Sequence, residues 1–473
     1  MMEIPCGMQE QFLEAKQLIE SSNDIKIYTH TDCDGICSGA ILSIILDRLN
    51  KDYEIEFVNL DEIEDLDLDH KLTIFSDLGS GQGVDKNAKD GQKILILDHH
   101  PPLRDINYKN DKAYTYLEIN PMFYGIDGSY YVCGGGLCYF LAKTFGFKDL
   151  SWIGVLSAIG DMQNNKTGHF EGLNEIIQED AINEGLLKVT KNDLNIYGRS
   201  TRPLYVALSY FSDVKLPTTN NQQEAKVVLE ELGVDEKHNR KTLSEVTEED
   251  KMEIKKFLSR MISKRVPPKY LKYVPKLIVG DAYTFLNEEE GSFLRDGSEF
   301  STAMNACGRN RKEAIGVDII KGDRFVALDA LEEVSKTHKY NLATSISKVA
   351  DNYHSEIIEL DNFQYFDCSD FDEDIASNII GTITGMVLGY CNWKKPILGF
   401  SKPKNNQIKV SLRCSKLLAY DGIHFGNMMR EIAKEVGGTG GGHAIACGAY
   451  IPNEKKSEFL DKFNRKLQGK IAN

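Results

Sequence analysis

The sequence lacks a long apolar run and a paired Cys-X-X-Cys motif. It contains no stretch of about 18 apolar residues, and its N-terminus lacks the charged, apolar and small-residue series of a secretion signal. These absences predict a cytoplasmic protein without a membrane span. The ten cysteines lack zinc-ligand spacing, so we expect most of them to be reduced packing residues.

Positive charge is also in the minority. The chain has 56 Lys and Arg against 71 Asp and Glu, a net charge of −15. This balance excludes a generally basic nucleic-acid coat but leaves room for a local basic groove. At 473 residues, with 41% hydrophobic and 27% charged residues, the chain fits a soluble globular protein of about three domains.

One apolar run leads directly into metal-ligand side chains. Residues 94–97 (Ile-Leu-Ile-Leu) are followed by Asp98, His99 and His100. Four apolar residues in a row are typical of a strand buried on both faces. Ligands of open α/β sheets bind at the carboxyl ends of strands, and Asp with His suits a divalent metal. This stretch therefore predicts part of a metal site.

Three other apolar runs, which we interpret as strands, end in the same way. Residues 26–29 precede His30, Asp32 and Asp34; residues 72–76 precede Asp77; and residues 152–159 precede Gly160 and Asp161. Alternate side chains of an extended backbone share a face, so we expect the first three to point at one place. A surface Asp after a single strand is common, but four such runs in succession indicate one shared metal site.

The remaining pattern of the first half indicates a mostly parallel sheet. Strands are expected at about 53–58, 72–76 and 93–97, alternating with helices. A helix from about residue 36 would direct its positive dipole end at the metal site, which favours phosphate. The glycines at 134–136 precede another helix and fit either tight helix–sheet packing or ligand contact.

The middle of the chain carries no catalytic signature. Acidic and helical segments dominate from about 175 to 270, with helices expected at 224–232 and 244–264. Residues 300–308 predict a helix closed by a C-terminal glycine, Gly308. Arg309 then follows, either as a nucleic-acid contact or as a helix-end charge.

Two features of the last third suggest phosphate binding. Residues 391–418 carry seven Lys and Arg and no acid, and they include a strand that ends at Arg413. The alternative is a solvated edge strand guarded by lysine. Further on, five glycines within 437–442 precede His443 and would let backbone N–H groups approach an anion. The alternative here is a flexible loop before a buried strand.

Together these motifs resemble the DHH phosphoesterase superfamily, named for the motif found here as Asp98-His99-His100. Residues 30–35 resemble its first motif, Asp77 its second and Gly160-Asp161 its fourth, while residues 440–443 resemble the signature of the companion DHHA1 domain. Residues 305–309 (Asn-Ala-Cys-Gly-Arg) resemble the archaeal RecJ branch, including GINS-associated nucleases. His30 departs from bacterial RecJ proteins, which usually carry Asp there, so the ligands of the first metal are in doubt.

The resemblance implies an α/β protein with four segments. These are a mostly parallel-sheet DHH domain (1–175), a helical insertion (176–290), a connecting segment (291–360) and a smaller α/β DHHA1 domain (361–473). The active-site cleft is expected between the DHH and DHHA1 domains.

The resemblance also implies a hydrolase with two divalent cations, Mn²⁺ or Mg²⁺. One cation is expected on His30 and Asp32, the other on Asp34, His99 and Asp161, with Asp77 bridging both. Asp98 and His100 are the expected catalytic residues. The residues expected to bind substrate are Arg309, Arg413, Gly440, Gly441, Gly442 and His443.

The leading hypothesis is an exonuclease on single-stranded DNA or RNA, with 5′→3′ polarity favoured, acting in DNA replication or repair. One alternative is a hydrolase of short oligonucleotides or cyclic dinucleotides. Another is a replisome scaffold with GINS as its partner, because a eukaryotic helicase subunit that resembles RecJ has lost the metal site. Every carboxylate motif is present in this chain, so we expect an active enzyme.

Overall fold

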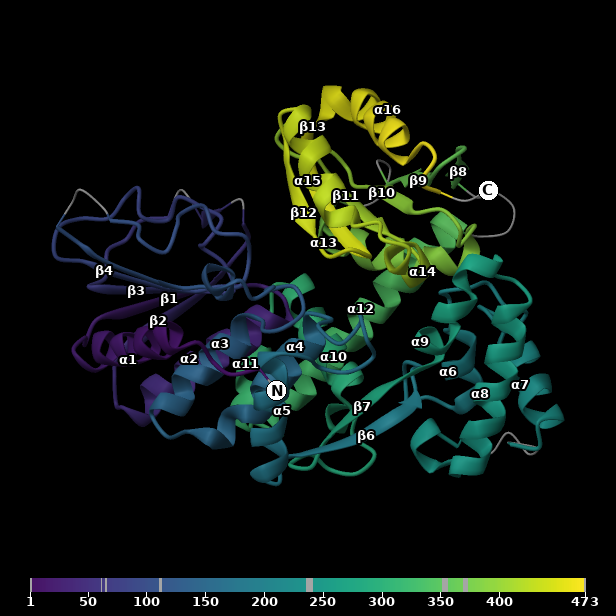
Figure 1. Ribbon diagram of the computed structural model, residues 1–473, viewed down its shortest axis with the longest axis horizontal. Coiled ribbons are helices and arrows are strands. Elements are labelled where there is room, and N and C mark those ends of the chain that lie inside the picture. Colours follow the sequence, from purple (N-terminus) through teal and green to yellow (C-terminus); the bar gives the residue numbers. More distant parts are fainter. Residues whose placement is uncertain are drawn as a thin grey trace. The chain divides into compact units, whose positions relative to one another are not determined.

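The computed structural model describes residues 2–60, 62–63, 66–109, 113–234, 241–350, 356–368 and 373–471, with the backbone alone for 373–378. The chain forms two compact units (Figure 1). Unit 1 comprises residues 1–192 and 281–335, and unit 2 comprises residues 193–280 and 336–473. The chain crosses between them within strands β6 (Leu187–Leu194) and β7 (Val279–Phe285), which pair with each other, and within helix α12 (Val326–Ala350).

Unit 1 is built on a five-stranded, all-parallel sheet of order β2-β1-β3-β4-β5. Its strands are β1 (Ile25–His30), β2 (Tyr53–Val58), β3 (Leu72–Ser76), β4 (Lys93–Leu97) and β5 (Thr115–Ile119). The strands predicted at 53–58, 72–76 and 93–97 are therefore confirmed. Sheet order reverses between β1 and β3, and open α/β sheets bind ligands beyond the carboxyl ends of strands at such a point.

Helices cover one face of this sheet, and irregular chain covers the other (Figure 1). The helices are α1 (Cys6–Glu20), α2 (Cys33–Arg48) and α3 (Gly134–Thr144). Ile74 and Leu95 pack under the helices, whereas Phe75 and Ile96 pack under the irregular segments. Because alternate side chains enter two different cores, β4 is apolar at every position after Lys93, and β3 has apolar residues on both of its faces.

The run at 152–159, which we interpreted as a strand, is a helix. Helix α4 (Ser151–Gly160) is buried from Ser151 to Ile159 and packs against α2, α3, α5 (Leu173–Asn183) and α10 (Gly297–Arg309). A helix surrounded on all sides is apolar all round, so its sequence resembles that of a buried strand. Asp161 consequently lies at the C-terminal end of a helix rather than of a strand.

The prediction that Gly308 closes its helix is also wrong. Helix α10 continues through Arg309 and is capped by Asn310. A β-carbon at Gly308 would overlap the carbonyl oxygen of Thr31, directly before Asp32. Glycine is therefore needed for the close approach of α10 to the loop after β1. Helix α11 (Glu313–Lys321) completes unit 1 beside α2.

Unit 2 combines a helical part with a mixed sheet. The helical part contains α6 (Leu204–Ser209), α7 (Gln222–Glu231), α8 (Glu248–Ser263) and α9 (Val274–Ile278), which confirms the helices predicted at 224–232 and 244–264. The strands are β8 (Ile358–Glu359), β9 (Gln364–Asp367), β10 (Ile397–Phe400), β11 (Gln407–Arg413), β12 (Thr439–Gly442) and β13 (Ala446–Pro452). Their order in the sheet is β12-β13-β11-β10-β9-β8.

Helices pack on both faces of the second sheet. One face carries α15 (Phe425–Glu435) and α16 (Lys456–Leu467), and the other carries α13 (Glu373–Val387); α14 (Lys416–Tyr420) follows β11. Phe363 and Phe366 are fully buried in these cores, so neither can stack on a nucleobase. Among the described residues, no helix combines the length and hydropathy that a bilayer span requires.

Candidate metal centre

The predicted metal ligands of unit 1 lie together beyond the carboxyl end of its sheet. His30 ends β1, Asp77 follows β3, and the Asp98–His100 motif follows β4. Asp32 is the N-cap of α2, and Asp161 is the C-cap of α4. Strand ends and helix ends thus both contribute side chains.

His30 and Asp32 point at one place, as expected, because the backbone is still extended at Asp32. Asp34 lies in the first turn of α2, which begins at Cys33, and belongs to a different cluster, as the resemblance implies. The first cluster contains His30, Asp32 and Asp77, with His30 Nδ1 3.1 Å from Asp32 Oδ2 and 3.4 Å from Asp77 Oδ2. The structure therefore divides the motif between two clusters.

The second cluster contains Asp34, His99 and Asp161. His99 Nε2 lies 3.6 Å from Asp34 Oδ2, and His99 Nδ1 lies 3.8 Å from Asp161 Oδ2. His99 Nε2 is also 3.2 Å from Asp77 Oδ1. One oxygen of Asp77 thus faces each cluster, which is the geometry of a carboxylate able to bridge two ions.

Asp34 is held by groups that the sequence alone did not identify. Its carboxylate accepts hydrogen bonds from the Gly134 N–H at 2.8 Å, the Gly135 N–H at 2.7 Å and the Ser157 hydroxyl. The two amides belong to the first turn of α3, where free N–H groups and the helix dipole favour an anion. The glycines at 134–136 were the available signal, and the anion is a side chain of the protein itself.

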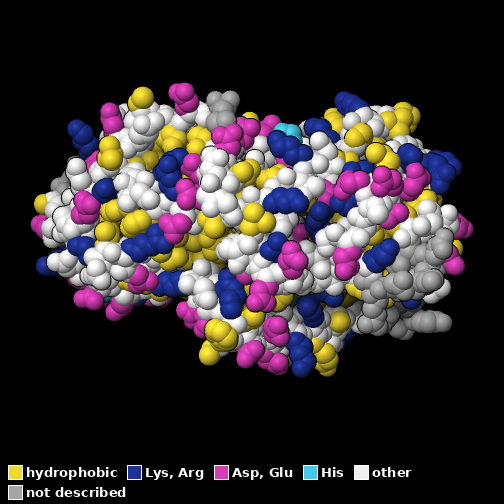
Figure 2. All heavy atoms as spheres, turned by 90° about the horizontal axis from the view of Figure 1, so that it is seen from below, with side chains coloured by type: hydrophobic (Ala, Val, Ile, Leu, Met, Phe, Trp, Pro, Cys, Tyr) yellow, Lys and Arg dark blue, Asp and Glu magenta, His cyan; other side chains and the backbone are white. Residues whose placement is uncertain are grey.

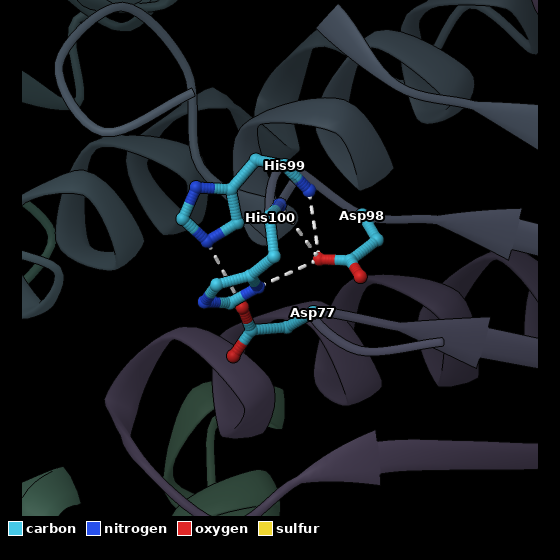
Figure 3. Close-up of side chains that lie close together, drawn as sticks. All are labelled: Asp77, Asp98, His99 and His100. Carbon is cyan, nitrogen blue, oxygen red and sulfur yellow. Dashed lines mark hydrogen bonds and ion pairs between the residues drawn. The ribbon is translucent and has the colours of Figure 1, made fainter. Parts of the chain in front are cut away.

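The Asp98–His100 motif forms a rigid network (Figure 3). Asp98 Oδ1 accepts from the backbone N–H groups of His99 and His100 and from His100 Nδ1, the last at 2.8 Å. Asp98 Oδ2 accepts from the Ser80 N–H at 2.9 Å. His99 instead donates its Nδ1–H to the Gly128 carbonyl at 2.7 Å, leaving Nε2 directed at the carboxylates. Asp98 therefore positions its neighbours, and His100 remains half-exposed.

Gln163 supports the other end of the second cluster. It is buried, and its amide donates at 2.8 Å both to Asp161 Oδ2 and to the Gly128 carbonyl. The same carbonyl holds His99, so one short network orients two predicted ligands. Nothing in the sequence pattern distinguishes Gln163 from an ordinary loop residue.

Burial and crowding perturb the titration of the clusters. Burial, with the nearby charges of Asp34 and Asp32, holds the pKa of Asp77 well above its usual range. Burial alone would lower the pKa values of His30 and His99, but the surrounding carboxylates outweigh it and raise both well above the usual value. The clusters therefore retain protons that divalent cations would displace.

The donor atoms fit divalent cations. Within each cluster the ligand atoms lie within 4.8 Å of one another. His30 Nδ1 and Asp77 Oδ2 are buried without a hydrogen-bond partner among the described residues, which is costly for polar atoms. A cation between them would satisfy both, and mixed Asp and His donors suit Mn²⁺ or Mg²⁺.

Three family models match the chain. They are the DHH family N-terminal domain over residues 24–155, the DHH-CID domain over 196–274 and the DHHA1 domain over 361–469. The chain belongs to the DHH family. The DHH match contains every predicted ligand except Asp161, and the DHH-CID match covers most of the insertion in which the sequence showed no motif.

Relatives and solved structures extend this result. An uncharacterized protein from Methanocaldococcus jannaschii is 31% identical over 446 residues, covering 93% of this chain and 92% of the relative. CDC45 from Entamoeba histolytica superposes with a TM-score of 0.62 at 14% identity, covering 98% of this chain and 99% of that chain. RecJ from Thermus thermophilus in complex with Mn²⁺ superposes with a TM-score of 0.54 at 12% identity, covering 99% of this chain and 55% of that chain. At these identities the two structures show a shared phosphoesterase fold.

In the DHHA1 domain, the strand that ends at Arg413 is not the solvated edge strand that the sequence left open as an alternative. Strand β11 pairs with both β10 and β13, so it is not an edge strand. Arg413 Nη1 donates to the Leu412 carbonyl at 2.7 Å, and burial lowers the pKa of the guanidinium. None of the described carboxylates forms an ion pair with Arg413.

The glycine-rich segment of the DHHA1 domain is a strand rather than a flexible loop. Gly440, Gly441 and Gly442 lie in β12, at the edge of the sheet, and pair with β13. A β-carbon at Gly440 would lie 3.1 Å from Ala433 Cβ on α15, so the glycines allow close helix packing. His443 follows β12, and its N–H donates to the carbonyl of Ala446, the residue paired with Arg413. Arg413 and His443 thus share one end of the sheet.

Arg309 lies at the last position of α10 in the DHH-containing unit, one residue after the contact with Thr31. It makes interactions within the protein. Its role in substrate binding stays a prediction, as do the roles of Arg413 and the Gly440–His443 segment.

Proposed function

We propose that this protein is a two-cation phosphodiesterase that removes nucleotides from an end of single-stranded nucleic acid. The observation that carries the proposal is the placement of Asp77 between the two clusters, with Oδ2 3.4 Å from His30 Nδ1 and Oδ1 3.2 Å from His99 Nε2. His30 and Asp32 would hold one cation, and Asp34, His99 and Asp161 the other. Two cations in such a site supply positive charge that stabilises both the attacking and the leaving oxygen of phosphodiester hydrolysis.

His100 would contact the scissile phosphate. Its ring is half-exposed, and Asp98 holds its Nδ1–H at 2.8 Å, which directs Nε2 outward. Ser80 and the backbone amides keep Asp98 itself in place. These contacts support His100 Nε2 as a hydrogen-bond donor held in a fixed position on the substrate side of the proposed metal centre.

The DHHA1 domain would bind the phosphate chain of the substrate through Arg413, His443 and the strand Gly440–Gly442, with Arg309 contributing from the DHH-containing unit. An unpaired, partly buried guanidinium supports this assignment. The predicted cleft between the two domains belongs to the same proposal. We favour 5′→3′ polarity, a role in DNA replication or repair, and kinship with the archaeal RecJ branch.

Two alternative functions remain: one has a different substrate, and the other involves no hydrolysis. The first is hydrolysis of short oligonucleotides or cyclic dinucleotides. The second is a replisome scaffold with GINS as its partner, which the similarity to the CDC45 fold favours. The complete set of carboxylates in both clusters favours an enzyme over a scaffold.

The test is digestion of end-labelled single-stranded DNA and RNA, beside a dinucleotide and a cyclic dinucleotide, with and without Mn²⁺. Stepwise loss from one labelled end would establish an exonuclease and its polarity. Cleavage of the small substrates alone would support the first alternative. No cleavage with Mn²⁺ bound would support the scaffold.

Asp77→Asn is the matched variant, because it keeps the shape of the side chain and removes its charge. We expect hydrolysis and Mn²⁺ binding to be lost and the circular dichroism spectrum to be retained. Full activity of Asp77→Asn would overturn the assignment of the metal centre.

A further inference from the structure

A second basic run begins in the DHH-CID segment and ends just beyond it, outside the candidate metal centre and outside the basic run at 391–418. Residues 254–280 contain eight Lys and Arg and no Asp or Glu, in a chain of net charge −15. The eight cations are Lys255, Lys256, Arg260, Lys264, Arg265, Lys269, Lys272 and Lys276. The insertion is acidic in its earlier helices, so this run is a local reversal of charge.

Several of these cations are exposed and unpaired. The run covers the end of α8, a short 3-10 helix at Pro268–Tyr273 and α9. Lys264, Arg265, Lys272 and Lys276 are exposed, and no described carboxylate forms an ion pair with any of them. Lys269 differs, because its Nζ lies 2.5 Å from Asp421 Oδ2.

Aromatic rings connect this run to the basic stretch of the DHHA1 domain. Tyr270, which is buried, contacts Trp393 with ring centroids 6.5 Å apart. Tyr273 contacts Tyr420 at 5.5 Å, and Lys276 Nζ lies 5.6 Å from the centre of the Tyr420 ring. Two positively charged segments more than a hundred residues apart in sequence therefore lie side by side within unit 2.

Packing alone does not explain this arrangement. Cation–π contacts account for Lys272, 4.8 Å from the Tyr273 ring, and for Lys276, but none of the described aromatic rings makes such a contact with Lys264 or Arg265. Like charges gathered on one surface repel each other. On the face seen in Figure 2, by contrast, acidic and basic side chains are interspersed.

We propose that this surface binds single-stranded nucleic acid. We call it the basic strip, defined by Lys264, Arg265, Lys272 and Lys276 with Tyr273 and Tyr420. The cations contact backbone phosphates, and a base stacks on one of the partly exposed tyrosine rings, as in proteins that bind single strands through charge and stacking. The substrate class rests on the proposed function, which the strip extends with a second binding surface that contains no residue of the metal centre.

The test measures strand binding without hydrolysis. Full-length protein is titrated in EDTA with fluorescein-labelled polythymidine and, separately, polyuridine, and anisotropy is followed over a range of salt concentrations. The strip variant is Lys264→Glu with Lys272→Glu and Lys276→Glu. The control is Lys188→Glu with Lys226→Glu and Lys434→Glu, which changes the net charge equally on other elements.

The strip variant should bind at least about tenfold more weakly than the control, and its salt slope should fall by about 2, because each lost phosphate contact contributes about 0.7 on a single strand. Tyr273→Ala should weaken binding about fivefold or more through lost stacking. Mn²⁺ affinity, measured by calorimetry, should be the same in all variants. The two labelled strands show whether DNA or RNA is preferred.

Equal affinities and equal salt slopes for the strip variant and the control would overturn the strip, even if the wild-type protein hydrolyses single strands. Failure of the wild-type protein to bind either strand would overturn it as well. Loss of affinity confined to the strip variant would support strand binding by the basic strip even if no hydrolysis is found. The experiment therefore distinguishes failure of the binding proposal from failure of the proposed hydrolysis.

Discussion

Three features of Asp77 are energetically unfavourable. It is fully buried, it lies among other carboxylates, and its φ of +59° falls in the left-handed region that few residues other than glycine adopt. Asp is among the residues that tolerate this conformation best. Strain and a raised pKa at one residue are typical of a functional site, where a bound ion compensates for them.

Ser157→Ala should reduce hydrolysis and Mn²⁺ affinity about 10- to 100-fold, the usual effect of removing a group that orients a metal ligand. The Ser157 hydroxyl donates to Asp34 Oδ1, so its loss leaves that oxygen with the Gly135 amide alone. Calorimetric titration with Mn²⁺ measures the effect directly.

Ser43→Ala is the matched control for this variant. Ser43 lies in α2 as Asp34 does, and its hydroxyl is buried without a hydrogen-bond partner among the described residues. We expect Mn²⁺ affinity in Ser43→Ala to equal that of the wild type. If both variants bind Mn²⁺ like the wild type, Ser157 has no positioning role.

Mn²⁺ affinity should rise with pH. Burial raises the pKa of Asp77, and the neighbouring carboxylates raise the pKa values of His30 and His99 despite burial. Protons on these groups compete with the cation, and the two histidines keep theirs above the usual imidazole pKa of about 6.5, so affinity should increase as the pH rises through and beyond that value. Calorimetry in buffers of different ionisation enthalpy counts the protons released, and a pH-independent affinity without proton release would contradict this assignment.

At the scale of elements, three helix ends position candidate metal ligands together with the strand ends. The first turn of α3 binds Asp34, the last residue of α4 leads into Asp161, and the C-terminal end of α10 packs on the loop before Asp32. Asn305 of α10 also accepts a hydrogen bond from the Cys33 N–H at 3.0 Å. The position of α10 therefore helps to fix the first cluster.

Gly308→Ala should lower the free energy of unfolding by about 1–3 kcal/mol and weaken Mn²⁺ binding. Ala normally favours a helix over Gly, so a loss of stability would come from the overlap with the Thr31 carbonyl. Chemical denaturation measures the change. The exposed Thr302→Ala on the same helix should change stability by less than about 0.5 kcal/mol, and equal stabilities of the two variants would argue against the close contact.

At the scale of the whole molecule, the two units carry different chemistry. Unit 1 contains both clusters of candidate metal ligands, and unit 2 contains Arg413, the Gly440–His443 segment and the basic strip. Unit 2 is discontinuous in sequence, so the DHH-CID segment and the DHHA1 domain share one packed body, with Trp393 and Leu417 in the core of the helical part.

Arg413→Ala should weaken the binding of single strands and leave Mn²⁺ affinity unchanged, because Arg413 belongs to unit 2 and the clusters belong to unit 1. Anisotropy in EDTA measures the first quantity and calorimetry the second. The exposed Arg465→Ala on α16 controls for the loss of one positive charge. Strand affinity equal to that of Arg465→Ala would show that Arg413 does not bind phosphate.

The sequence by itself determined the parallel sheet and the residues at its carboxyl edge. Short apolar runs at 72–76 and 94–97 followed by Asp and His specify buried strands with ligand side chains at their ends, because the strand signal and the ligand signal are both local. The helices of the insertion were predictable for the same reason.

Tertiary structure decided what holds those residues in place. It made residues 152–159 a helix, because a helix packed on all sides has the apolar sequence of a buried strand. It directed Ser157 and the α3 amides at Asp34, and it joined two basic segments far apart in sequence. These features depend on contacts between distant residues, which no local pattern in the chain encodes.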